Sequence, residues 1–131
     1  MSLNRRNFVR CAAAGLGAMA VVSREVVPSA QEPTMSLNVL YPNHEGARFD
    51  IAYYRSTHIP LAMKIMKASS VMLIEGVSNG APAPYAMIAH FQFPSADALK
   101  AALADPGMAD VRADVPRFTD IRPTVMVGRS V

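Results

Sequence analysis

The sequence predicts an α+β domain made of two strand–helix–strand units. Four segments alternate apolar and polar residues with the period of two that is typical of strands, and two segments repeat apolar residues at the helical spacings of three and four. Their order is strand, helix, strand, strand, helix, strand. Two such units form a four-stranded antiparallel sheet with both helices on one face, the ferredoxin-like βαββαβ arrangement.

The first unit begins with a strand over residues 36–41, which a turn at Pro42-Asn43 closes. Asp50 is placed to cap the next helix. The apolar face of this helix repeats at spacings of three and four, through Ile51, Tyr54 and His58. Residues 71–77 alternate again and form the second predicted strand.

A proline lies inside the first helical pattern. Pro60 has no amide hydrogen and pushes Ile59 away from helical angles. We therefore expect the helix to break or kink around residues 57–59 and to restart with Pro60 in its first turn. His58 would then lie at the end of a helix, where the last carbonyl groups favour a positively charged imidazole.

The second unit follows a turn at Asn79-Gly80. Residues 85–93 alternate as the third strand. Its larger side chains occupy one face, and the other face carries Ala86, Ile88, His90 and Gln92. Ser95 is placed to cap the second helix, which Pro106-Gly107 interrupts before a short continuation. Residues 121–127 alternate as the last strand.

The predicted strands are apolar on both faces, although two helices can cover only one face. An exposed sheet face of this composition would promote aggregation. A second copy of the chain would cover it most simply, with the two sheets enclosing a core or a cavity. The sequence therefore predicts a homodimer.

Residues 1–30 have the pattern of a secretory signal. A cationic start is followed by an uncharged apolar run over residues 11–22 and by a small-residue exit at Pro28-Ser29-Ala30. As a helix this run would be about 18 Å long, too short for the ~30 Å hydrocarbon core, so we expect no stable membrane span. An ordinary amphipathic helix is the alternative interpretation.

The start of this leader resembles the twin-arginine export motif, through the segment Asn4-Arg5-Arg6-Asn7-Phe8-Val9-Arg10. The resemblance implies passage through the twin-arginine export machinery and a periplasmic or secreted location. Residues 31–34 then form a linker, and residues 35–131 form one domain.

The basic residues gather in the same leader. The net charge of the chain is +3, and all of it belongs to residues 1–30, because the rest contains nine Lys and Arg and nine Asp and Glu. The domain therefore lacks the net basic charge with which proteins bind nucleic acid. The single cysteine, Cys11, excludes a disulfide framework and a thiolate zinc site.

The most specific motif follows the first predicted strand. Leu40-Tyr41-Pro42-Asn43 and Gly46-Ala47-Arg48-Phe49-Asp50 precede Tyr53-Tyr54 and Thr57-His58-Ile59-Pro60-Leu61. Together these segments resemble the EthD family, named for a protein required in ethyl tert-butyl ether degradation. The resemblance covers residues 35–131 and implies ferredoxin-like protomers that pair as dimeric α+β barrels. It also implies that His58 is an acid/base at the mouth of the barrel. Typical members lack the export leader.

Candidate catalytic groups lie on the first helix. His58 is the first candidate for moving a proton, and Tyr54 lies one turn earlier on the same face, where it could orient the imidazole. Tyr41 offers a second phenol that could hold a carbonyl or phenolic oxygen. The structural alternatives are a helix cap for His58 and packing for both tyrosines.

Candidate ligand-binding groups lie elsewhere in the chain. His90 and Ile88 share the strand face that we expect to line the dimer cavity, and Arg48 could steer an anionic substrate. A buried structural histidine is the alternative for His90, and solvation is the alternative for Arg48. No metal site is predicted, because the histidines show no ligand spacing. No organic cofactor is predicted either, with haem in the barrel as the alternative.

Two classes of function fit these residues. One is a small enzyme without an organic cofactor, associated with oxidoreductase chemistry or acting as an isomerase or lyase. It would take a small apolar molecule, aromatic or lactone-like, with His58 as acid/base. The other is a non-catalytic ligand-binding or accessory protein for a redox or degradation pathway. The sequence leaves both open.

Overall fold

The computed structural model describes Gly17 and residues 33–131. The predicted leader, apart from Gly17, and the first half of the linker lie outside the described residues. Within the described part of the chain, no helix is long and apolar enough to cross a membrane.

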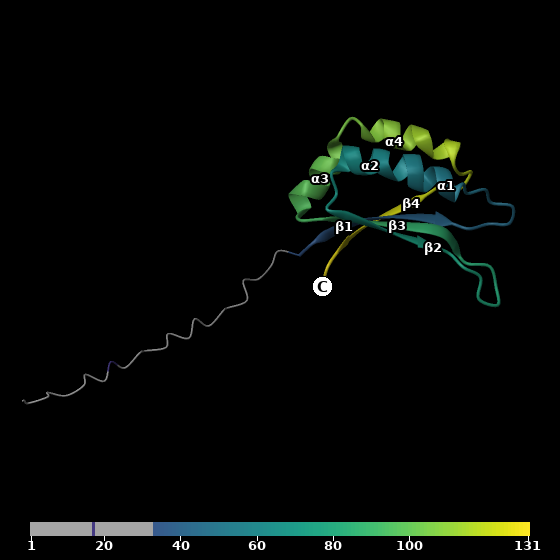
Figure 1. Ribbon diagram of the computed structural model, residues 1–131, viewed down its shortest axis with the longest axis horizontal. Coiled ribbons are helices and arrows are strands. Elements are labelled where there is room, and N and C mark those ends of the chain that lie inside the picture. The colour runs from purple at the N-terminus through teal and green to yellow at the C-terminus, as the bar shows by residue number, and fades with distance from the viewer. Residues whose placement is uncertain (1–16, 18–32) are drawn as a thin grey trace, which may run out of the picture. The chain divides into compact units, whose positions relative to one another are not determined.

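The elements follow the predicted order. They are β1 (Met35–Pro42), α1 (Ile51–Tyr53), η1 (Tyr54–His58), α2 (Ile59–Met66), β2 (Ser70–Glu75), β3 (Tyr85–Phe93), α3 (Ala96–Ala104), α4 (Met108–Asp114), η2 (Val115–Arg117) and β4 (Thr124–Arg129). The sheet has the strand order β2-β3-β1-β4 and is antiparallel throughout. The helices lie on one face of it (Figure 1). The predicted ferredoxin-like fold is confirmed.

Two helix starts have the predicted caps. The Asp50 side chain accepts a hydrogen bond from the amide of Tyr53, and the Ser95 side chain accepts one from the amide of Ala98. Each cap satisfies an amide at the start of its helix that has no partner within the helix.

The chain stays helical through Ile59, so the expected break does not occur, but the expected restart does: α2 begins at Ile59 with Pro60 in its first turn. His58 and Ile59 keep right-handed helical angles, with φ near −68° and −64°. The helix instead widens into a π-helical turn over η1, where the amide of Ile59 donates to the carbonyl of Tyr54. A wider turn tolerates the missing proline amide, because the hydrogen bonds shift by one residue. His58 therefore lies inside the helix and not at its end.

The last strand starts later than predicted. The strand β4 begins at Thr124, whereas Ile121 is buried in the core before it. The amide of Ile121 donates to the Thr119 hydroxyl, and Pro123 has no amide to offer a neighbouring strand. At Ile121 the apolar pattern therefore reflects packing in the core, and only from Thr124 onward does it reflect strand pairing.

The core lies between the sheet and the helices. Four aromatic rings meet edge to face or tilted at one end of it, with centroids 4.9–6.0 Å apart: Tyr41, Phe49, Tyr54 and Phe118. Such contacts add to the stability that burial of the rings already provides. This cluster fixes the two tyrosines that face the site described below.

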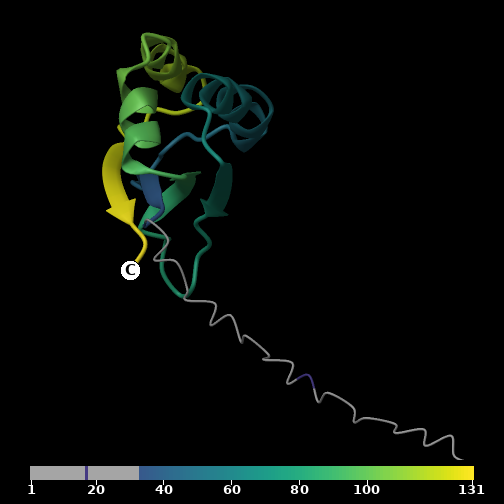
Figure 2. The ribbon, with the colours of Figure 1, turned by 90° about the vertical axis from the view of Figure 1, so that its left-hand side faces the viewer.

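The other face of the sheet carries no helix (Figure 2). His90 and Ile88 lie on this face, opposite Met72 and Ile74 of β2. Met72 is 59% exposed and Ile74 is 47% exposed, as Met126 of β4 is at 54%. The described residues therefore leave an apolar face open to solvent, as the alternation of β3 predicts.

Candidate functional site

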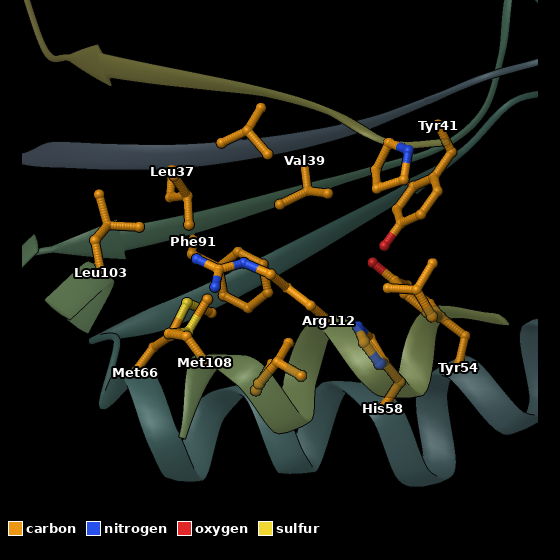
Figure 3. Close-up of a pocket in the computed structure, with 15 residues that line it drawn as sticks. Leu37, Val39, Tyr41, Tyr54, His58, Met66, Phe91, Leu103, Met108 and Arg112 are labelled. Carbon is orange, nitrogen blue, oxygen red and sulfur yellow. The ribbon is translucent and has the colours of Figure 1, made fainter. Parts of the chain in front are cut away.

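A cavity of about 310 Å³ lies between the sheet and the helices (Figure 3). Its walls come from β1, β3 and β4 on one side, and from η1, α2, α3 and α4 on the other. Eleven of its fifteen lining residues have purely apolar side chains, and the four others are Tyr41, Tyr54, His58 and Arg112. A concave, mostly apolar site with a few polar groups is typical of small-molecule binding.

Two phenols face each other at one end of this cavity. The hydroxyl oxygens of Tyr41 and Tyr54 point toward one another in Figure 3. Burial raises the pKa of Tyr41 to about 12, and burial also raises the pKa of Tyr54 far above its usual range. Both phenols are therefore protonated at neutral pH. A protonated phenol has an O–H group that can donate a hydrogen bond to a ligand.

His58 borders the same end of the cavity. Its ring stacks on Tyr54, with centroids 5.3 Å apart, and lies against Phe118. Burial lowers the pKa of His58 below 6.5, although the hydrogen bond to Asp114 acts in the opposite direction. The imidazole is therefore neutral at pH 7. The sequence predicted a positively charged imidazole at a helix end. That expectation is corrected here, because burial has the largest effect on the pKa of His58 and favours the neutral form.

Asp114 of α4 orients this imidazole. His58 Nδ1 lies 2.9 Å from Asp114 Oδ2, and the Tyr53 hydroxyl donates to Asp114 Oδ1 at 2.7 Å. Burial acts to raise the pKa of Asp114, but these two hydrogen bonds and the nearby Arg117 outweigh burial. The pKa of Asp114 is therefore below its usual value, and the carboxylate stays ionised. An ionised carboxylate accepts the proton of Nδ1, which leaves the lone pair on Nε2. The pair is arranged as a carboxylate-oriented base.

The sequence interpretation missed Asp114. It is separated from His58 by 56 residues, and nothing in the local sequence links the two. Its one signal is its place in the predicted helical continuation, three residues after the core residue Val111. A carboxylate beside a buried helix face needs a partner, and that requirement could have pointed to His58.

The structure does not bring the predicted ligand-binding residues together. Tyr41 lines the cavity, whereas His90 and Ile88 lie across the sheet from it. His90 Nδ1 instead lies 2.6 Å from Asn38 Oδ1. The Arg48 guanidinium donates to the carbonyl of Pro116 at 2.9 Å, and Arg48 does not line the cavity. Strand alternation explains the split, because neighbouring residues of β3 face opposite sides.

The described residues contain no group of three or more His, Cys, Asp or Glu that could hold a metal ion. The polar side chains among the lining residues are two phenols, one imidazole and one guanidinium.

The EthD domain model matches residues 46–122. This range begins in the loop after β1 and ends just before β4. The chain belongs to the EthD family. The match includes the helix that carries Tyr54 and His58 and the helix α4 that carries Asp114. Both partners of the hydrogen-bonded pair thus lie within the EthD domain.

Solved structures of EthD proteins share this fold. An EthD-like protein from Ralstonia eutropha is 29% identical, with a TM-score of 0.65, over 74% of this chain and 91% of the other. An EthD family protein from Bacillus halodurans is 19% identical, with a TM-score of 0.60, over 75% of this chain and 99% of the other.

A third structure shares the fold alone. SnoaB from Streptomyces nogalater, a cofactor-independent oxygenase, is 13% identical, with a TM-score of 0.50, over 76% of this chain and 96% of SnoaB. No curated protein matches the sequence.

Proposed function

We propose that this EthD protein binds a small apolar molecule, aromatic or lactone-like, and acts on it without an organic cofactor, with His58 as general base. The observation that carries the proposal is the 2.9 Å contact between His58 Nδ1 and Asp114 Oδ2 at the wall of an apolar cavity. A buried imidazole held by a carboxylate is a common arrangement for proton transfer.

The proposed step is the removal of one proton from the ligand. His58 Nε2 accepts it from an acidic C–H or O–H group, and the electron pair of that bond stays on the ligand as an enolate or phenolate. A hydroxyl of the Tyr41–Tyr54 pair donates to the oxygen that becomes negative. The imidazolium that forms is stabilised by the ionised Asp114.

Such an anion is a shared intermediate for several reactions. Reprotonation at another atom gives isomerisation, loss of a leaving group gives dehydration, and electron transfer to dioxygen gives oxidation without a cofactor. SnoaB supports the last route, because this fold hosts a cofactor-independent oxygenase there. An oxidation of this kind uses dioxygen as the oxidant and the ligand anion as the reductant.

The test is turnover of a panel of naphthols and aryl lactones by the full chain and by His58→Ala. Oxygen uptake and mass spectrometry of the products would be measured. We expect His58→Ala to lower turnover by about 10²–10⁴-fold while the ligand still raises the melting temperature. Undiminished turnover in His58→Ala would remove His58 from the mechanism.

The non-catalytic function is the competing outcome of the same test. A carrier or accessory protein would bind members of the panel and gain thermal stability without converting any of them. Haem binding would appear as a Soret band in the purified protein, and we expect none.

We further propose that the chain forms a homodimer through the open face of its sheet. The support is the exposed apolar set on this face, which includes Met72, Ile74 and Met126. Burying such side chains against a second copy removes apolar surface from water, and this drives association.

We also propose that residues 1–30 direct export through the twin-arginine machinery to the periplasm or beyond. The support is the Arg5-Arg6 pair followed by an uncharged apolar run. This route carries proteins that have already folded, which suits a site assembled from distant parts of the chain.

A further inference from the structure

Arg112 is the single charged residue among those that line a cavity otherwise walled by apolar and aromatic groups and one neutral imidazole. It lies in the last turn of α4. In Figure 3 its guanidinium is directed toward Leu37 and Phe91, away from His58. The cavity therefore has two chemically different ends, with a proton-transfer end at His58 and a cationic end at Arg112.

The guanidinium of Arg112 has no acidic partner within residues 33–131. The ion pairs of these residues involve His44, His58 and Arg117. The two carboxylates nearest to it along α4, Asp110 and Asp114, line a separate hollow on another side of the helix. Residues two apart in a helix point in nearly opposite directions, which explains the separation.

Two other arginines of the domain, Arg48 and Arg117, contact protein groups. Arg48 donates to the carbonyl groups of Pro116 and Arg117, and Arg117 lies 3.8 Å from Asp114. Arg112 makes no comparable contact within the described part of the chain, and it faces a cavity. Its charge is therefore available to a molecule that enters.

We propose that Arg112 binds an acidic group, so that the substrate of this site is an apolar, ring-containing molecule with one carboxylate. This inference rests on the proposed function, whose substrate class it narrows. Arg112 is exposed, and its planar guanidinium offers two parallel N–H donors that match a carboxylate. The carboxylate at Arg112 would direct the other end of the molecule toward His58.

The charge of the cavity lining agrees with this assignment. His58, Tyr41 and Tyr54 are neutral at pH 7, and the negative charge of Asp114 lies behind the imidazole with both oxygens in hydrogen bonds. One positive charge therefore faces the cavity, so an anion is favoured over a neutral or cationic molecule of the same shape.

The test uses two probes of the same shape, 2-naphthoate and 2-naphthamide, with the full-length chain at pH 8. Affinities would be measured by the fluorescence of the naphthalene ring for the wild type, Arg112→Gln and Arg55→Gln. Arg55 is exposed on η1 and does not line the cavity, so its variant is a control with the same change of charge.

We expect Arg112→Gln to weaken naphthoate binding about tenfold or more and to leave naphthamide binding unchanged. Arg55→Gln should leave both unchanged. Arg112→Lys, which keeps the charge but loses the planar fork, should bind naphthoate with intermediate affinity. Thermal melts of the variants would verify that each is folded.

Two other results would overturn the inference in different ways. Equal naphthoate affinity in the wild type and Arg112→Gln would show a guanidinium that only extends into solvent, and the proposed function would stand. Binding of neither probe by the wild type would overturn the proposed cavity function, and this inference with it.

Discussion

At the scale of residues, His58 and Asp114 act as a pair whose members change each other's proton affinity. Burial lowers the pKa of His58, and the hydrogen bond to Asp114 partly restores it. The same contact helps to keep the Asp114 carboxylate ionised. The result is a neutral base with a fixed tautomer in a mostly apolar site.

The pH dependence of activity follows from this balance. Because the pKa of His58 lies below 6.5, the base is unprotonated at pH 7, and kcat/KM should be constant there. The rate should fall as the pH decreases through the lowered pKa, since the imidazole then takes up a proton. A rate profile from pH 4.5 to 8 on the converted compound is the measurement. An acid limb centred above 6.5 would contradict the assignment.

Asp114→Asn separates orientation from simple packing. The amide removes the charge that raises the pKa of His58, so the acid limb should move to lower pH. The maximal rate should also fall, by about 10²-fold or more, because the amide no longer enforces the Nδ1–H tautomer. Asp110→Asn on the same helix is the control. Neither its maximal rate nor the acid limb of its pH–rate profile should change.

At the scale of elements, the helix α3 depends on its cap. The Ser95 hydroxyl accepts a hydrogen bond from the amide of Ala98 at the start of this helix. Ser95→Ala should lower the free energy of unfolding by about 1 kcal/mol, and Ser95→Thr should restore most of it. Urea denaturation of the three proteins is the measurement. Identical midpoints for all three would refute the role of the cap.

The elements also show where sequence interpretation succeeds. The strand β3 was predicted over its full length, because nine residues alternate without interruption between turn signals. The caps at Asp50 and Ser95 were predicted for the same local reason. Periodicity and capping depend on neighbours in the chain, so the sequence alone reveals them.

The features that sequence interpretation missed depend on contacts between residues that are distant in the chain. Pro60 predicts a break from local sterics, but a π turn within a packed helix accommodates it. The pairing of Tyr54 with His58 was predicted from their shared helix face, whereas Asp114 and Arg112 enter the site through the packing of α4. Half of the site was therefore accessible from the sequence, and the half supplied by α4 was not.

At the scale of the whole molecule, the open sheet face decides the proposed dimer. Ile74→Lys places a charge among apolar residues of that face, so the chain should become monomeric. Val127→Lys is the matched control, because Val127 is similarly exposed but occupies the side of the sheet where the helices lie. Size-exclusion chromatography with light scattering is the measurement. A dimeric Ile74→Lys or a monomeric wild type would contradict the proposal.

Export is also a property of the whole molecule. Replacing the pair with Arg5→Lys and Arg6→Lys keeps the charge of the leader but should abolish translocation, since the twin-arginine route requires the arginines themselves. Fractionation of cells that express the full chain would show the protein in the cytoplasm only. Unchanged export of the double variant would indicate a general secretory route.

The placement of the tyrosines has an optical consequence. The chain has four tyrosines and no tryptophan, so its ultraviolet emission comes from phenols alone. Tyr41 and Tyr54 form one end of the cavity, and Tyr53 donates to the carboxylate that holds His58. Three of the four tyrosines thus lie at or beside the proposed reaction centre. Binding of a ligand that quenches tyrosine fluorescence should therefore be measurable with the unlabelled protein.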